Sequence, residues 1–311
     1  MSSKICVVGT LAYDSVETPF GKTPNALGGS ATFISIAASY FTPSASVVGI
    51  VGGDFNSFNV FEKRGIGTKG VEVKQDGKTF HWAGKYHFDM NNRDTLDTQL
   101  NVLLDFDPVI PDEQKEAEFV CLGNIDPTLQ LKALKQFTAP KFVICDTMNF
   151  WIERMYGEVI EVLKHVDCFV INESEAREMT KEHNLVKAAK KILSFGCKHV
   201  VIKKGEHGAL LFSDNGEIFS APAFPLIDII DPTGAGDSFA GGMIGYLSQC
   251  SEITEISLRR AVIYGTAMAS FCCEKFSVDG LLNLNDKIIR DRVDKLQSLG
   301  AFSFEEDTYG I

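Results

Sequence analysis

The sequence predicts an α/β fold in which helices cover both faces of a mainly parallel sheet. Short apolar runs alternate with segments of helical periodicity along the 311 residues, and this alternation is typical of parallel sheets. An apolar content of 45% and a charged content of 23% are those of an ordinary globular protein. We therefore expect a single domain over residues 1–311, with ligands at the carboxyl ends of its strands.

Each element is predicted from the spacing of its apolar residues. Strands are expected where a short apolar run stands between helical segments, and the candidates are 5–9, 47–51, 119–123, 142–146, 168–172, 200–203 and 227–230. Helices are expected where apolar residues recur every three or four positions, and the candidates are 31–41, 128–137, 155–165, 173–180, 186–195, 238–248, 257–273 and 285–299.

One region departs from this alternation. Between about residues 72 and 104 the sequence is polar, and within it an apolar or aromatic side chain recurs at alternate positions from 80 to 90. A period of two is typical of a strand with one apolar face, formed here by Phe80, Trp82, Tyr86, Phe88 and Met90. Such a face has to be covered by the main domain, by a ligand or by a second subunit.

The acidic balance of the chain limits its partners. A net charge of −11 argues against nucleic acids and anionic membranes, which attract an excess of lysine and arginine. No apolar stretch is long enough for a membrane span or for the core of a signal peptide. The eight cysteines form no C-x-x-C motif, which favours reduced thiols. We therefore expect a cytoplasmic protein that binds neither nucleic acid nor membrane.

The most informative motif is D-P-T-G-A-G-D-S-F-A, residues 231–240, which follows the apolar run 226–230 and opens a predicted helix. Backbone N–H groups at a helix start bind anions, and Gly234, Ala235 and Gly236 leave the approach to them open. Asp237 places a carboxylate at the edge of the same site. An anion site beside a carboxylate suits phosphoryl transfer to an alcohol. The alternative is a tight turn in which Asp237 only caps the helix.

This motif resembles the C-terminal signature of the ribokinase-like carbohydrate kinases, the PfkB family, whose pattern is close to D-T-x-G-A-G-D-[ST]-F. Pro232 departs from it, since the family usually has Thr there. The resemblance implies a three-layer α/β/α fold and a small β lid, here from approximately 12–25 and 72–104. It also implies an ATP- and Mg²⁺-dependent kinase, with Asp237 as the base, that phosphorylates a hydroxymethyl group of a sugar, a nucleoside or a related small alcohol. In some members the lid also forms a homodimer interface.

Two further motifs match the part of the family pattern that binds the acceptor. Asp14 follows the first predicted strand, where the family has a carboxylate that binds substrate hydroxyls. Gly28 and Gly29 resemble the N-terminal Gly-Gly signature, and Thr32 stands near the position of an Asn that binds a sugar hydroxyl. From the residues alone, Asp14 is an ordinary loop carboxylate and the two glycines are a turn before a helix.

The nucleotide side of the family pattern is matched by two segments. Asn172 and Glu175 form an N-x-x-E motif, in which the resemblance makes Glu175 a water-mediated Mg²⁺ ligand, although a capping box explains both residues equally well. Lys203, Gly205 and Gly208 resemble the T-x-G-x-x-G segment along the nucleotide, with Lys203 in the place of Thr. From the residues alone, this segment is a hairpin turn with solvated lysines.

Several alternatives remain open. By resemblance, Asp231 and Thr233 are candidate K⁺ ligands. The aromatic face is compatible with a nucleobase or with a dimer interface, and Arg93 leaves a phosphorylated sugar open as the acceptor. A catalytically inactive ligand-binding protein is the alternative function. A dehydrogenase is disfavoured, because the G-x-G-x-x-G at 65–70 follows a helical stretch and precedes a strand, the reverse of the dinucleotide-binding order.

Overall fold

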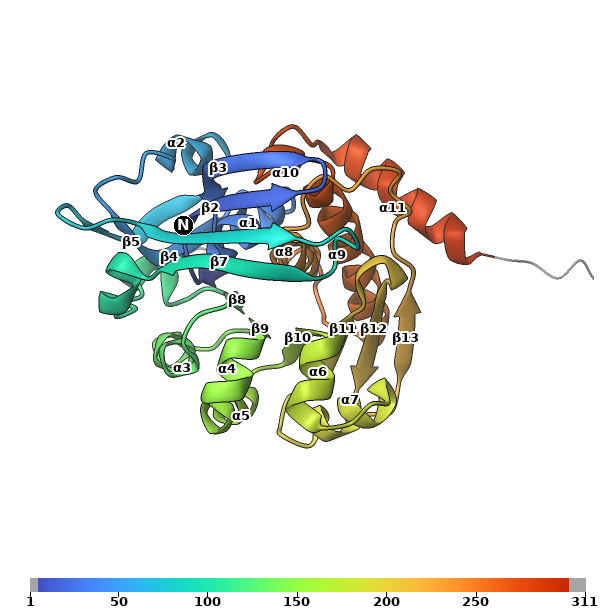
Figure 1. Ribbon diagram of the computed structural model, residues 1–311. Coiled ribbons are helices and arrows are strands. Elements are labelled where there is room, and N and C mark those ends of the chain that lie inside the picture. Colours follow the sequence, from blue (N-terminus) through green and yellow to red (C-terminus); the bar gives the residue numbers. More distant parts are fainter. Residues whose placement is uncertain (1–4, 302–311) are drawn as a thin grey trace, which may run out of the picture.

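The computed structural model describes residues 5–301 and contains two sheets (Figure 1). The larger has the strand order β13-β12-β11-β10-β9-β8-β1-β4-β5, and the smaller has the order β3-β2-β6-β7. The strands of the large sheet are β1 (Ile5–Val8), β4 (Ala45–Gly52), β5 (Gly67–Lys74), β8 (Phe119–Leu122), β9 (Phe142–Asp146), β10 (Cys168–Asn172), β11 (His199–Lys203), β12 (Ala209–Ser213) and β13 (Ile218–Ala221). Those of the small sheet are β2 (Ala12–Thr18), β3 (Gly21–Gly28), β6 (Phe80–Tyr86) and β7 (Arg93–Gln99).

The helices are α1 (Ser30–Ala38), α2 (Phe58–Lys63), α3 (Pro127–Leu134), α4 (Asn149–Arg154), α5 (Tyr156–Leu163), α6 (Glu173–Thr180), α7 (Leu185–Leu193), α8 (Ala235–Leu247), α9 (Glu255–Cys273), α10 (Asp279–Leu282) and α11 (Asp286–Gly300). Short 3₁₀ helices span Asn101–Asp105, Asp112–Gln114 and Gly205–His207. No helix within residues 5–301 is both long enough and apolar enough to cross a membrane.

The large sheet separates two hydrophobic cores. Successive side chains of a strand point to opposite faces, so Val7 of β1 lies in one core and Val8 in the other. Buried residues of α1, α8 and α9 complete the first core, and those of α3, α5, α6 and α7 complete the second. In Figure 1 the helices α3 to α7 lie together below the sheet. This is the predicted arrangement of helices on both faces of a mainly parallel sheet.

Most of the predicted elements are confirmed. Every predicted helix is present, and every predicted strand except 227–230 belongs to the large sheet. The pairings along β9, β8, β1, β4 and β5 and from β9 to β11 are parallel, whereas β11, β12 and β13 pair antiparallel. The hairpin reading of the turn after Lys203 is therefore correct.

The strand predicted at 227–230 is wrong. Ile227 is 99% exposed, while the N–H groups of Ile230 and Asp231 donate to the carbonyl of Cys273 at the end of α9. Ile229 packs against an apolar cluster of the small sheet. The run is apolar partly because it covers that sheet, and its backbone bonds go to a helix end, so it forms no strand.

The small sheet is built from two segments far apart in sequence. Strand β2 starts just beyond the carboxyl end of β1, and β3 leads directly into α1. The second segment, β6 and β7, pairs with β2 through β6 in parallel register. The sheet thus spans 12–28 and 80–99, and β5 up to Lys74 belongs to the large sheet.

The aromatic strand is shorter than predicted. It ends at Tyr86, and Phe88 is 92% exposed in the turn that follows. Tyr86 and Met90 are buried with Val16, and Trp82 packs against them. The alternating pattern therefore identified an apolar face correctly, but the face ends where the backbone turns toward β7.

Candidate active site

The 231–240 motif forms an anion-binding helix start. Helix α8 begins after Gly234, whose φ of 78° lies in the left-handed region that favours glycine. A Cβ at Gly234 would lie 2.5 Å from the ring of Phe33, so the loop is held against α1. Ala235 donates its N–H to the carbonyl of Pro232 at 3.1 Å. Among the described residues, the N–H groups of Gly236 and Asp237 have no hydrogen-bond partner. The N–H groups of Gly236 and Asp237 are therefore free to bind an anion, and that of Ala235 is used within the turn.

Asp237 lies in the first turn of α8 and is half-buried. Burial raises the pKa of Asp237 to about 7, and the negative charge of Asp146 adds to the rise. The positive charges of Lys203 and Arg93 oppose it. A carboxyl group with a pKa near neutrality is suited to accept a proton at physiological pH.

Asp14 lies on β2, close to the charges of Asp231 and Asp237, and is 8% exposed. Burial raises the pKa of Asp14 to about 7, and those two neighbouring charges contribute. Gly28 lies directly against it, because a Cβ at that position would be 2.0 Å from Oδ2 of Asp14. Gly29 has a φ of 94° and caps α1. The predicted acceptor residues Asp14, Gly28 and Gly29 are thus brought together.

Thr32 lies on α1 and is fully buried. Among the described residues its hydroxyl group has no hydrogen-bond partner, which is unusual because buried polar atoms are normally paired. Its role as an acceptor contact stays a prediction.

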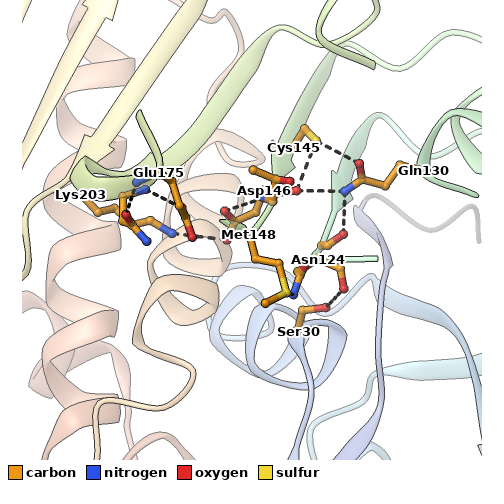
Figure 2. Close-up of polar contacts among 11 residues, drawn as sticks. Ser30, Asn124, Gln130, Cys145, Asp146, Met148, Glu175 and Lys203 are labelled. Atoms are coloured by element: carbon orange, nitrogen blue, oxygen red, sulfur yellow. Dashed lines mark hydrogen bonds and ion pairs between the residues drawn. The ribbon is translucent and has the colours of Figure 1, made fainter. Parts of the chain in front are cut away.

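Three neighbouring strands of the large sheet place polar side chains at their carboxyl ends, and two of these side chains are charged. Asp146 ends β9 and Lys203 ends β11, while Asn172 ends β10 between them. Figure 2 shows Asp146, Glu175 and Lys203 close together. The distance from Lys203 Nζ to Asp146 Oδ2 is 3.3 Å. A Cβ at Gly236 would lie 2.8 Å from Lys203 Nζ, so this ammonium group borders the helix start of α8.

Lys203 keeps its charge in this setting. Burial lowers the pKa of Lys203, but the negative charges of Asp146, Glu175 and other acids outweigh it and leave the pKa raised. The backbone of Asp146 is held in place by Gln130, whose Nε2–H group donates to the Asp146 main-chain carbonyl at 2.9 Å (Figure 2). The lysine is therefore a permanent cation beside the free amides of α8.

Glu175 and Asn172 form the capping box of α6. Asn172 Oδ1 accepts from the Glu175 N–H at 2.9 Å, and Glu175 Oε2 accepts from the Asn172 N–H at 3.0 Å. Burial raises the pKa of Glu175 to about 7, while the charge of Lys203 opposes the rise. Among residues 5–301, Oε1 of Glu175 has no hydrogen-bond partner within the protein, so it can still hold a water molecule. The structural role and a water-mediated metal role are therefore compatible.

The turn after β11 contains both predicted glycines. Gly205 has a φ of 55° and Gly208 one of 84°. A Cβ at Gly208 would lie 2.0 Å from the Ala221 carbonyl oxygen, so this hairpin requires glycine. A Cβ at Gly205 would lie 2.6 Å from Oδ1 of Asn91, in the turn between β6 and β7. The small sheet thus reaches the turn that the sequence assigned to the nucleotide.

The candidate potassium ligands are already hydrogen-bonded. Asp231 accepts from the N–H groups of Thr233 at 2.9 Å and of Ser277 at 3.2 Å. The hydroxyl group of Thr233 donates to Tyr86 at 3.2 Å, and its carbonyl accepts from the thiol of Cys272 at 3.3 Å. These contacts fix the loop between α9 and the small sheet. A K⁺ site here stays a prediction.

Sequence reasoning missed Asp146. It is buried, 5% exposed, and forms the ion pair with Lys203. The available signal was its place as the last residue of a predicted strand, because ligands gather at the carboxyl ends of parallel strands.

Fold and site together define a class of protein: an α/β phosphotransferase with a helix start for an anion, an adjacent acid and a second small sheet. The chain belongs to the pfkB family of carbohydrate kinases, whose family model matches residues 2–283. It is therefore a ribokinase-like kinase, as its 231–240 motif indicated.

The similarity to known proteins extends over most of the chain. A cytidine kinase of Thermococcus kodakarensis is 27% identical over 83% of this chain and 94% of its own length. A nucleoside kinase of Methanocaldococcus jannaschii has the same fold, with a TM-score of 0.74 at 18% identity over 94% of this chain and 99% of that one. An E. coli protein described as Ribokinase II, solved with ATP and Mg²⁺, has a TM-score of 0.76 at 18% identity over 94% of this chain and 99% of that one.

Proposed function

We propose that this kinase transfers the γ-phosphoryl group of ATP to a hydroxymethyl group of a sugar, a nucleoside or a related small alcohol. The observation that carries the proposal is the position of Asp237 next to two unpaired N–H groups at the start of α8. The carboxylate can accept a proton, and the two N–H groups can bind negative charge. Phosphoryl transfer to an alcohol needs both functions.

Asp237 removes the proton from the acceptor hydroxyl. As the oxygen–phosphorus bond forms, the bond between the γ-phosphorus and the bridging oxygen breaks, and ADP leaves with that electron pair. The free amides of Gly236 and Asp237 stabilise the charge on the moving group. A pKa of about 7 leaves Asp237 ionised in a large fraction of molecules at neutral pH.

The nucleotide phosphates are assigned to the positive side of the site. Lys203 borders Gly236 and attracts phosphate oxygens. Glu175 has an oxygen without a partner among the described residues and suits a metal-bound water. When bound, Mg²⁺ neutralises phosphate charge. Asp146 holds Lys203 in place and adds a second carboxylate to this side.

The acceptor is assigned to the other side of Asp237. Asp14 accepts hydrogen bonds from acceptor hydroxyls, and Gly28 has no side chain that would occupy the space directly beside the Asp14 carboxylate. The small sheet acts as a lid that excludes water from the reaction. The names of the cytidine kinase and nucleoside kinase relatives support a sugar or nucleoside as the acceptor class.

The lid also offers an edge for a second copy of the chain. All residues of β7 (Arg93–Gln99) are exposed, and it is the edge strand of the small sheet. Exposed strand edges readily pair with another chain. We propose that the protein forms a homodimer through this edge. Size-exclusion chromatography with light scattering on the wild type and on Leu96→Asp tests this proposal. A monomeric wild type would contradict the homodimer.

ADP release is the direct test of the reaction. The protein is assayed with ATP and Mg²⁺ against ribose, fructose, ketodeoxy sugar acids, cytidine, adenosine and inosine, with Asp237→Asn as the control. We expect acceptor-dependent ADP release with at least one compound and a phosphorylated product by mass spectrometry. Nucleotide and acceptor binding without any product would favour the inactive ligand-binding alternative.

A further inference from the structure

Arg93 is the residue of the small sheet whose position bears most on the reaction. It begins β7 and pairs with Tyr86 of β6 in the antiparallel register. Side chains of directly paired residues lie on the same face of a sheet. Tyr86 is 5% exposed and its hydroxyl accepts from Thr233 of the anion loop at 3.2 Å. Arg93 therefore projects from the face that covers this loop.

The turn before β7 gives a second indication of where Arg93 lies. Asn91, two residues before it, lies against Gly205 of the turn assigned to the nucleotide. Arg93 thus stands between the contact with Thr233 and the contact with Gly205. Its guanidinium lies 5.7 Å from the ring centroid of Trp82. Among residues 5–301, Arg93 forms no ion pair, so its donors are available to a ligand.

The positive charge of the Arg93 guanidinium acts on acids from both sides of the site. This charge opposes the rise that burial causes in the pKa of Asp14 on the acceptor side and of Glu175 on the nucleotide side. It also opposes the rise in the pKa of Asp237. These acids therefore lie within electrostatic range of Arg93, and the pairing of Arg93 with Tyr86 places it over the loop that the phosphoryl group crosses in the proposed reaction.

We propose that Arg93 is a catalytic residue, delivered by the small sheet, that contacts the phosphoryl group during transfer. The proposal rests on the proposed function. A phosphoryl group in transfer spreads negative charge over three oxygens, and a guanidinium offers several donors in a planar fork. Lys203 borders the opposite side, at Gly236. The two cations then hold the group from the lid and from the large sheet.

The alternative occupant is an anionic group on the acceptor. The site already contains more acids than bases: Asp14, Asp146, Glu175, Asp231 and Asp237 against Lys203 and Arg93. An acceptor with its own negative charge would add to this excess, whereas the γ-phosphoryl has to enter the site in any case. The charge balance therefore favours an uncharged acceptor and leaves Arg93 to the transferred group.

The test compares Arg93→Gln and Arg93→Lys with Lys85→Gln. Lys85 lies on the same small sheet but is exposed and pairs with Glu17, so it controls for loss of positive charge. With an acceptor from the panel, we expect Arg93→Gln to lower kcat at least ~100-fold with KM values within about threefold, since one phosphoryl-stabilising arginine is worth ~10³ or more. Arg93→Lys should recover little of this, because a lysine lacks the planar fork.

A binding measurement separates this proposal from the proposed function. Wild type and Arg93→Gln are titrated with ADP and Mg²⁺, with and without aluminium fluoride, a mimic of the group in transfer. We expect equal affinity for ADP alone and a loss of ~10-fold or more for ADP with aluminium fluoride in the variant. Equal affinities in both titrations would overturn the role of Arg93, even if no acceptor is found. A change only in KM for the acceptor would also overturn it, in favour of an anionic acceptor.

Discussion

Asp237→Asn separates the chemical role of this residue from its role in the fold. The side chain is half-buried and its pKa is raised from 3.8 to about 7, chiefly by burial. At 1.36 kcal/mol per pH unit this corresponds to at most ~4 kcal/mol. Solvent screening and the coupling to its neighbours reduce the expected effect to about 1–2 kcal/mol. The free energy of unfolding of the wild type falls by this amount when Asp237 ionises in the folded state.

The direction of the effect follows from proton linkage. Between pH 3.8 and about 7 the folded state holds a proton on Asp237 that the unfolded state has released, so stability falls as the pH rises through this range. An asparagine cannot ionise. We therefore expect Asp237→Asn to be about 1–2 kcal/mol more stable than the wild type at pH 8 and nearly equal to it at pH 4. Turnover should fall by ~10²–10⁴, the usual contribution of a general base.

Urea unfolding at pH 4, 6 and 8 and ADP release with a productive acceptor measure the two effects. Asp228→Asn is the matched control, because Asp228 is an exposed acid of the segment before the same loop. It should change neither stability nor turnover. Near-normal turnover of Asp237→Asn would refute the assignment of the base. A loss of stability at pH 8 would refute the electrostatic argument.

Three further substitutions test the surroundings of the site. Gly234→Ala should lower stability in urea by about 2–4 kcal/mol, against about 1 kcal/mol for Gly216→Ala, which also has a positive φ but has no atom nearby; equal losses would contradict the clash. Glu175→Gln should raise the Mg²⁺ concentration needed for the half-maximal rate ~10-fold. An unchanged magnesium titration would contradict the metal role of Glu175 and leave its role in capping α6. Lys203→Met should cost about 3–5 kcal/mol by leaving Asp146 unpaired. Lys203→Met with Asp146→Asn should regain stability but not affinity for ATP, and a regained affinity would remove Lys203 from nucleotide binding.

The sequence allowed much of the large sheet to be predicted, because buried parallel strands are continuous apolar runs with distinct helices between them. The same rule failed at 227–230, where apolar residues cover a neighbouring sheet instead of lying inside one. It also predicted neither β12 nor β13 as a strand, although the glycine turn before β12 was compatible with a hairpin. Periodicity records which face is buried but not what buries it, and that information lies in distant parts of the chain.

In the candidate site, motifs that repeat a known pattern led to Asp14, Glu175 and Asp237, whose roles stay predictions. Asp146 was missed because a single acid at a strand end has no pattern of its own, and only the register of β9, β10 and β11 brings it to Lys203. The use of the Ala235 N–H within its own turn was likewise invisible, since it depends on backbone angles. Pairings across the sheet and loop conformations are thus what the sequence left undetermined.

The loop before α8 is supported by residues remote from it in the chain as well as by hydrogen bonds within its own turn. Phe33 from the first helix presses on Gly234, and Ser277, beyond α9, donates to Asp231 while its hydroxyl donates to the Leu27 carbonyl. Contacts between such distant segments close late in folding. Because Ser277 lies 46 residues after Asp231, the loop lacks this support until synthesis has passed the end of α9, so we expect nascent chains shorter than that to have no phosphotransferase activity.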